Sequence, residues 1–212
     1  MSTVSSPAEN RIYLENIRWP TYLALLEDLG EHRGRLTYDQ GSLEIVSPSK
    51  KHENLTKRLA RLIEAFTEAL GIKIQSVRST TLNREDLRRG VEADECYYVA
   101  NESAVRHRDD IDLARDPPPD LAVEIEVSRR VLGRLPIYAA IGVPEVWRYD
   151  GKTLRVSQLG DDGEYHESEE SVVFPALPVA EVARFLAQYA TSDETELVRA
   201  FRGWVRSHFE LG

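Results

Sequence analysis

The stretch DLAVEIEVS, residues 120–128, decides the fold of this chain. Successive side chains of a β-strand point to opposite faces of its sheet. One face of this strand therefore carries Leu121, Val123, Ile125 and Val127, and the other carries Asp120, Ala122, Glu124 and Glu126. A strand with this many apolar residues is expected in the interior of a sheet. The carboxylates on its second face are then buried and need a positive charge or hydrogen-bond donors beside them.

The acids on this strand have two interpretations. Burying a carboxylate costs several kcal/mol unless it is paired or bound, so a row of buried acids indicates a metal site. The alternative is a half-exposed edge strand whose acidic face is solvated. The apolar residues on either side of each acid favour the metal site.

A second acidic group lies in VEADECYYV, residues 91–99, which is predicted as the preceding strand. Alternation puts Glu92 and Asp94 on one face and Glu95 on the other. Hard divalent ions bind oxygen ligands from separate chain segments. Asp94 and Glu124, on adjacent strands, would supply such ligands.

Outward from these strands, helical spacing predicts a helix from Trp19 that stops at Gly30, and a clearer one over 53–70 that Gly71 ends. Between them, residues 35–47 predict a hairpin whose second strand turns Ser42 and Glu44 away from Leu43 and Ile45. Further predicted strands cover 72–79, 145–149, 154–159, a segment near Tyr165 and 172–174. A further helix is predicted to begin at Ser128 or at Pro136 and to run towards Gly142. Two more predicted helices cover 179–190 and 194–209. This order predicts an α/β fold with a mixed sheet.

The composition fits one globular domain. The chain has 212 residues, 42% apolar and 30% charged, so we expect a polar tail over residues 1–12 and one domain over 13–212. No apolar run approaches the roughly 18 residues of a membrane helix, and the polar start is unlike a secretory signal. The single cysteine, Cys96, suits a reducing cytoplasm. Gly-rich phosphate loops and the GxSxG, CxxC and HExxH motifs are absent from the sequence.

The net charge of −9 argues against a general positive coat for nucleic acid. Basic residues nevertheless gather at the start of the long helix, and four of them are candidates for nucleic-acid contact: Lys51, His52, Lys57 and Arg58. The alternative is the solvated face of a helix, which is usual for such charges.

Most of the chain resembles the Uma2 family of proposed restriction endonucleases, within the PD-(D/E)XK nuclease superfamily. Four motifs carry the resemblance: GSLEIVSPSKKHE (41–53), TTLNREDLRRGVEADECYYV (80–99), PPPDLAVEIEVS (117–128) and IYAAIGVPEVWRYDG (137–151). It implies a restriction endonuclease-like core, a mixed sheet flanked by helices with added hairpins.

The resemblance also implies a site. Asp94 and Glu124 would ligate Mg²⁺, for which Mn²⁺ can substitute, and Glu44 matches a family acid near that site. Asp120 is either a further ligand or a structural turn residue. Such enzymes cut duplex DNA as symmetric pairs, so the resemblance implies DNA as partner and a homodimer.

The sequence departs from the family at the catalytic lysine. The superfamily lysine position, two residues after Glu124, holds Glu126, and the alternative position before Leu-x-x-Tyr holds Arg134. Arginine grips a phosphate but donates no proton near neutral pH. We therefore expect a Mg²⁺-dependent endonuclease in which Glu126, Arg134 and Glu44 assist catalysis. Two alternatives are a catalytically inactive nuclease-fold protein that binds nucleic acid or a protein, and a hydrolase of smaller phosphoesters.

Overall fold

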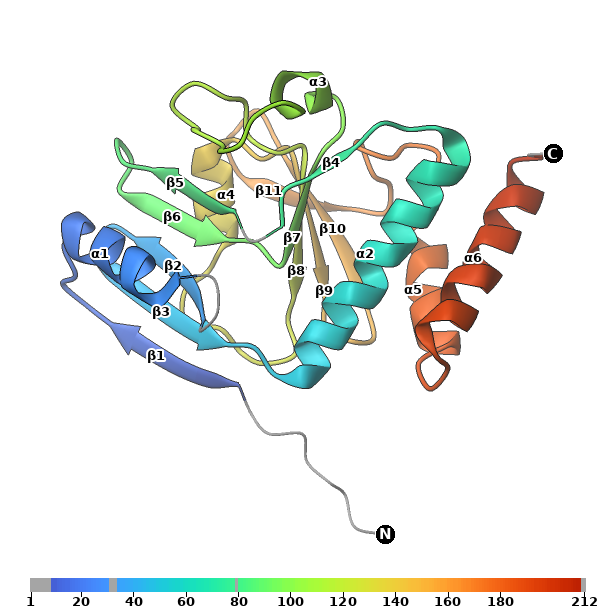
Figure 1. Cartoon of the computed structure of the whole chain (residues 1–212), viewed down its shortest axis with the longest axis horizontal. Coiled ribbons are helices and arrows are strands. Elements are labelled where there is room, and N and C mark those ends of the chain that lie inside the picture. The colour runs from blue at the N-terminus through green and yellow to red at the C-terminus, as the bar shows by residue number, and fades with distance from the viewer. Residues whose placement is uncertain (1–8, 31–33, 79, 211–212) are drawn as a thin grey trace, which may run out of the picture.

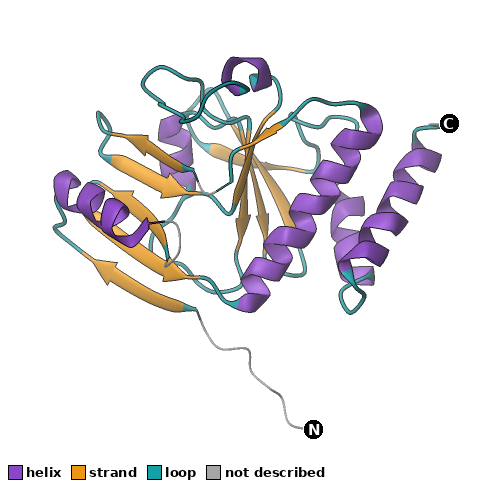
Figure 2. Ribbon diagram, in the orientation of Figure 1, coloured by secondary structure: helices purple, strands orange, loops and turns teal. Residues whose placement is uncertain are grey.

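Two twisted β-sheets and the helices around them form the molecule (Figures 1 and 2). The structure is a computed structural model that describes residues 9–30, 34–78 and 80–210. The order of strands is β1-β3-β2-β6-β5 in the first sheet and β11-β10-β9-β8-β7-β4 in the second. This mixed α/β architecture agrees with the predicted fold class.

The first sheet is antiparallel and carries Glu44 on its inner face. Its strands are β1 (Asn10–Leu14), β2 (Arg35–Asp39), β3 (Ser42–Ser47), β5 (Thr81–Arg84) and β6 (Arg89–Glu92). Helix α1 (Trp19–Leu29) covers the outer face, where Trp19 and Tyr22 pack on Tyr38 and Leu43. Alternation along β3 then turns Glu44 inward, towards the second sheet.

The second sheet has the predicted strand in its middle. Its strands are β4 (Gln75–Ser76), β7 (Glu95–Tyr98), β8 (Leu121–Ile125), β9 (Glu145–Tyr149), β10 (Leu154–Leu159) and β11 (Tyr165–Ser168). Strands β8 and β9 are parallel, whereas the other neighbours are antiparallel. All five residues of β8 are buried, so the solvated edge strand considered above is ruled out.

Helices cover both faces of the second sheet. On one face lie α2 (Lys50–Leu70), α5 (Val179–Gln188) and α6 (Glu194–His208), and their apolar sides pack on Leu121, Val123 and Ile125. On the other face, α4 (Leu135–Ile141) packs on Ala122 and also on Leu82 and Val91 of the first sheet. The short α3 (Glu102–Val105) lies in the connection to β8. The predicted alternation of β8 is thus confirmed.

Several predicted elements need correction. Residues 91–99 do not form one strand: β6 ends at Glu92 in the first sheet and β7 begins at Glu95 in the second. Ala93 and Asp94 cross between the sheets, so Glu92 and Asp94 do not form a row on one strand face. Residues 10–12, expected in the N-terminal tail, belong to β1, which pairs with β3.

The other corrections have local causes. Residues 172–174 are not a strand, because the amides of Val172 and Phe174 donate to the side chains of Glu145 and Ser171 instead of a neighbouring strand. Of 72–79, only Gln75–Ser76 pairs as a strand. The long helix begins at Lys50, since Ser49 caps it by accepting a hydrogen bond from His52 N. Helix α4 begins near Pro136, not at Ser128. No helix in the described ranges is long and apolar enough to cross a bilayer.

Candidate active site

Asp94 and Glu124 come together where the two sheets meet. Glu95 of β7 pairs with Val123 of β8, so one step further along the same register Asp94 lies opposite Glu124. Both residues are buried, with 1% and 2% of their surface exposed. Asp94 Oδ2 accepts a hydrogen bond from the amide of Ile125 at 2.6 Å. The strand crossing between the sheets therefore delivers one carboxylate, and the central strand delivers the other.

The side chain of Arg130 lies among the oxygen atoms of this pair. Its Nη2 donates to Glu124 Oε2 at 2.7 Å and to the carbonyl oxygen of Ile125 at 3.1 Å, and it lies 3.6 Å from Asp94 Oδ2. Burial and the nearby Arg134 lower the pKa of Arg130. A single positively charged nitrogen thus faces three oxygens from three groups. Sequence reasoning missed Arg130, because it lies in an irregular loop between β8 and α4 where no periodicity marks a side chain as inward-facing.

Glu124 is held from the α4 side as well. Arg134 Nη1 lies 2.9 Å from Oε1 and 2.8 Å from Oε2 of Glu124, and the Tyr138 hydroxyl donates to Oε1. Although burial alone would raise it, the pKa of Glu124 lies below its ordinary value because of the Arg134 and Arg130 guanidiniums. Arg134 Nη1 also donates to the carbonyl of Glu92 at 2.9 Å. Arg134, expected to grip a phosphate, is 5% exposed and fixes the position of Glu124.

Asp94 is bound by Arg35 of β2 and lies against His52 of α2. Arg35 Nη1 contacts Asp94 Oδ1, and His52 Nε2 lies 3.0 Å from Asp94 Oδ2. Burial and Arg35 lower the pKa of His52 to about 4. The ring is therefore neutral near pH 7, with Nδ1–H donating to Glu9 at 2.7 Å and Nε2 accepting from Arg35 at 3.2 Å. His52 forms a buried wall of the site and does not reach the surface.

Glu44 belongs to the same network but contacts neither Asp94 nor Glu124 among the described interactions. Its Oε1 accepts from Arg11 Nη1 at 2.6 Å and from the amide of Val131 at 2.9 Å. Arg11 also donates to Ser128 Oγ at 2.8 Å. Glu44 and Arg11 thereby tie β3 and β1 to the loop that carries Arg130.

Glu126 lies at the mouth of the site. Its side chain is 31% exposed, and the nearest guanidinium, that of Arg148, is 4.0 Å away. A pocket of 580 Å³ opens here and is lined by both Glu124 and Glu126. Four arginines also line it: Arg129, Arg130, Arg134 and Arg148. The pocket therefore combines carboxylates with positive charge, a combination that suits a phosphodiester beside a metal ion.

Asp120 lies at the opposite end of β8, about 13 Å along the strand from Glu124. Its Oδ2 accepts from the amides of Val99 and Asn101 at 2.6 and 3.1 Å, and its Oδ1 accepts from the Asn101 side chain at 2.9 Å. These bonds close the turn after β7. The contacts correspond to the turn-residue interpretation of Asp120 and leave it outside the Asp94–Glu124 pair.

We predict that Asp120→Ala lowers the free energy of unfolding by about 2–3 kcal/mol, because it leaves two partly buried amides without an acceptor. Urea denaturation of the metal-free protein measures this loss. The affinity for Mn²⁺, measured by calorimetry, should stay within about twofold of the wild-type value. A loss of Mn²⁺ binding at unchanged stability would instead make Asp120 a ligand.

The residues expected to contact nucleic acid separate in the structure. Lys51 and Lys57 are exposed on α2. Arg58 donates to the carbonyl oxygens of Tyr189 and Ser192, so it anchors the connection between α5 and α6. Of the four candidates, only the two lysines present a free charge at the surface.

The donor atoms at the pair fit a hard divalent ion. Among the residues that the structure describes, no three His, Cys, Asp or Glu side chains group into a metal site. Two carboxylates and the Ile125 carbonyl nevertheless offer three oxygens, and Mg²⁺ keeps waters for its other positions. These oxygens already surround one cationic nitrogen. A metal ion would replace Arg130 there, so the fit requires that side chain to move aside.

Comparison with known proteins identifies the family of this chain. The model of the Uma2 family, described as "Putative restriction endonuclease", matches residues 19–189. A crystal structure of "a putative nuclease" from Anabaena variabilis superposes with a TM-score of 0.50 at 13% identity, over 79% of this chain and 98% of that one. No curated protein matches. The match covers most of the chain and the elements that carry Asp94 and Glu124, and the chain therefore belongs to the Uma2 family of restriction endonuclease-like proteins.

Proposed function

We propose that this protein is a divalent-metal-dependent endonuclease that hydrolyses DNA phosphodiester bonds beside Asp94 and Glu124. One observation carries the proposal: three oxygens, from Asp94, Glu124 and the Ile125 carbonyl, converge on a single positive charge. Membership of a family described as restriction endonucleases supports the same activity.

Each residue of the site has a part in this chemistry. Asp94, Glu124 and the Ile125 carbonyl would hold Mg²⁺, or Mn²⁺ in its place, and the bound ion would supply Lewis acidity to a phosphate oxygen and to water. Arg134 and Tyr138 orient Glu124. Glu126, half-buried at the pocket mouth, accepts a proton from the attacking water and exchanges it with solvent.

The arginines of the pocket supply the remaining charge. Arg148 and Arg129 line the side from which a phosphodiester would enter, and their guanidiniums would balance charge that develops on its non-bridging oxygens. Arg134 adds its positive charge from the buried α4 side, where it also holds Glu124. Glu44 acts at a distance, because it fixes the loop that carries Arg129 and Arg130 through the amide of Val131. Cleavage of both strands of a duplex further suggests a symmetric dimer.

A second candidate function has its own support. Arg35, Arg130 and Arg134 all face the two carboxylates, so the pair is already neutralised without a metal. This favours a nuclease-fold protein that binds DNA without cutting it. The two functions differ in whether a metal displaces Arg130.

Cleavage of supercoiled plasmid with Mg²⁺ or Mn²⁺ tests the proposal. Asp94→Asn should lower the rate at least ~100-fold, because it removes the charge of one ligand. Asp39→Asn is the matched control, since Asp39 also pairs with an arginine, Arg89 at 2.8 Å, but lies outside the site. It should cleave at nearly the wild-type rate. Wild-type protein that shifts DNA in a gel but cuts it with neither metal would establish the binding function instead.

A further inference from the structure

A groove between α2 and α6 concentrates arginine. Its volume is 490 Å³, and four of the side chains that line it are arginines: Arg61 from α2, and Arg199, Arg202 and Arg206 from α6. None of its lining residues is acidic, although the whole chain carries a net charge of −9. Such a local excess of positive charge in an acidic protein indicates a site for an anionic partner.

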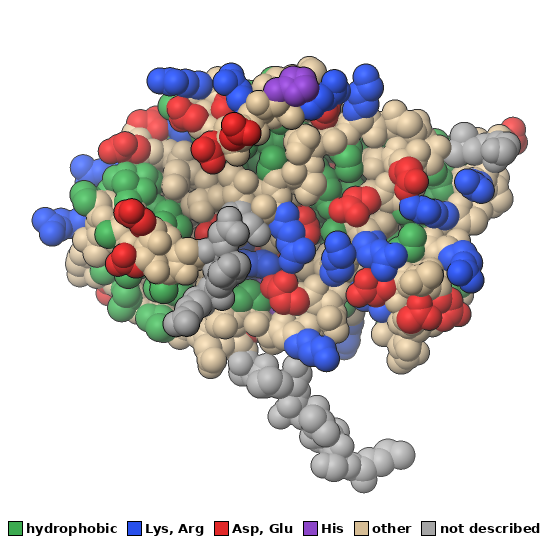
Figure 3. All heavy atoms as spheres, in the orientation of Figure 1, with side chains coloured by type: hydrophobic (Ala, Val, Ile, Leu, Met, Phe, Trp, Pro, Cys, Tyr) green, Lys and Arg blue, Asp and Glu red, His purple; other side chains and the backbone are tan. Residues whose placement is uncertain are grey.

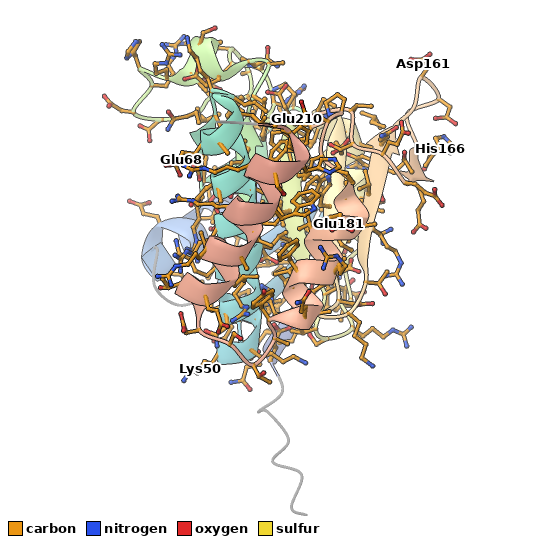
Figure 4. All side chains as sticks on the ribbon, turned by 90° about the vertical axis from the view of Figure 1, so that its right-hand side faces the viewer. Lys50, Glu68, Asp161, His166, Glu181 and Glu210 are labelled. Atoms are coloured by element: carbon orange, nitrogen blue, oxygen red, sulfur yellow. The ribbon has the colours of Figure 1, made fainter. Side chains whose placement is uncertain are left out.

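The two helices lie side by side, which makes the groove a fixed feature. Figure 4 shows α6 running along α2, with Glu210 close to the level of Glu68. The inner side of α6, including Leu197, Phe201 and Val205, is buried in the core beneath. Arg199, Arg202 and Arg206 are three and four residues apart and therefore form one row along the helix. The core holds this row against α2.

Two of the arginines have no internal partner. Arg61 pairs with Glu194 at 2.9 Å, and Arg202 pairs with Glu68, both from the rim of the groove. Within residues 9–210 as described, no carboxylate lies within ion-pair distance of Arg199 or Arg206. Both are exposed, so their charges are free to meet a ligand.

Gly203 lines the groove between the arginines. A mid-helix glycine costs about 1 kcal/mol relative to alanine. Packing does not require it here, because a Cβ at this position would meet no atom within 4 Å. Its effect is to bare the helix backbone between Arg199, Arg202 and Arg206, where a partner can approach closely.

The helix that carries Arg61 of the groove also carries His52 of the candidate active site. His52, in the first turn of α2, touches Asp94, and Arg61 lies nine residues later, about 14 Å along the helix. The exposed Lys57 lies between them. Figure 3 shows Lys and Arg side chains over α2 and α6 on this face, with acidic side chains among them.

We propose that this groove binds the phosphate backbone of the DNA that flanks the cleaved bond. Guanidinium groups suit this partner because their planar forks match phosphate oxygens. The inference rests on the proposed function for the position of the cleaved bond. The partner itself follows from the arginine row, in which Arg199 and Arg206 are exposed and form no ion pair among the described residues. Residues 195–206 lie beyond the segment that matches the family, so the groove is assigned from this chain's own residues.

Binding of a fluorescently labelled 30-base-pair duplex in EDTA, over a series of salt concentrations, tests the groove without any metal. Arg199→Ala/Arg206→Ala should bind about tenfold more weakly near 0.1 M salt. The slope of log K against log salt should become shallower by about 1.8, since two phosphate contacts are lost. Arg115→Ala/Lys152→Ala removes the same charge from exposed positions outside the groove and should leave the slope unchanged.

The outcomes separate this inference from the proposed function. Equal affinity and slope for the groove variant and wild type would overturn it, even if wild-type protein cuts plasmid. Weaker binding by a folded groove variant would support it, even if wild-type protein proves unable to cut. Tighter wild-type binding to poly-glutamate than to duplex would overturn it in favour of an acidic protein partner. Circular dichroism confirms folding, which exposed Arg→Ala changes in a helix should preserve.

Discussion

Glu124→Gln should lower the free energy of unfolding by about 3–5 kcal/mol and reduce DNA cleavage by at least ~1,000-fold. The carboxylate accepts hydrogen bonds from Arg130, Arg134 and Tyr138 in a fully buried setting. Removing its charge leaves the buried Arg134 without a counter-ion and leaves Arg130 with only Asp94, 3.6 Å away, and breaking a buried ion pair in this way is strongly destabilising. The same change removes one of the two proposed carboxylate ligands of the metal.

Chemical denaturation and plasmid cleavage measure the two effects separately. Glu126→Gln is the matched control for stability alone, because Glu126 lies two residues further along the chain yet is 31% exposed. Glu126→Gln should lower the free energy of unfolding by less than about 1 kcal/mol. The cleavage rates of the wild type and of Glu124→Gln are to be compared at a temperature below that at which Glu124→Gln begins to unfold. Equal stability of the two variants would mean that the Arg130–Glu124–Arg134 cluster does not form.

Arg130→Gln should tighten the binding of Mn²⁺ by about 100-fold. Arg130 Nη2 occupies the space among the three oxygens that the ion would use. Two unit charges 4 Å apart repel by about 4 kcal/mol at an effective dielectric constant of 20, so removing the arginine relieves a repulsion of this order. Part of that gain would be lost, because the wild-type side chain would move into the pocket as the ion bound.

Calorimetric titration with Mn²⁺ measures the affinity directly and needs no activity. Arg129→Gln is the control, since Arg129 is the exposed neighbour in the same loop. It should bind Mn²⁺ as the wild type does. If Arg130→Gln binds Mn²⁺ no more tightly than the wild type, the arginine and the metal do not compete for one position. If the double variant Arg130→Gln/Glu124→Gln keeps the higher affinity for Mn²⁺, the ion binds at another place.

The sequence predicts the centre of the fold well because β8 is buried on both faces. Its alternation reports two different packing partners, α2 for Leu121 and Val123 and α4 for Ala122 and Glu124. The crossing at Asp94 was not predictable from the same pattern. Residues 91–99 read as one strand, because alternation records the direction of side chains and carries no information on which strand each half pairs with.

The sequence also indicates which two acids meet at the candidate site. Asp94 and Glu124 stand out as acids in apolar strands. Arg130 and Arg11 reach the site from a loop and an edge strand, and their inward orientation depends on contacts with Glu124 and Glu44 that only the folded chain provides. Glu44 was identified through the family resemblance, but its link to the loop amide of Val131 required the structure.

The chain passes from the first sheet to the second at Ala93 and Asp94. The candidate site therefore lies at the interface between the two sheets. Neither half can loosen alone, because Arg35 from the first sheet and Ile125 from the second grip the same carboxylate. Heat or denaturant should therefore melt both halves in one transition, and the proposed metal site should be lost together with the fold.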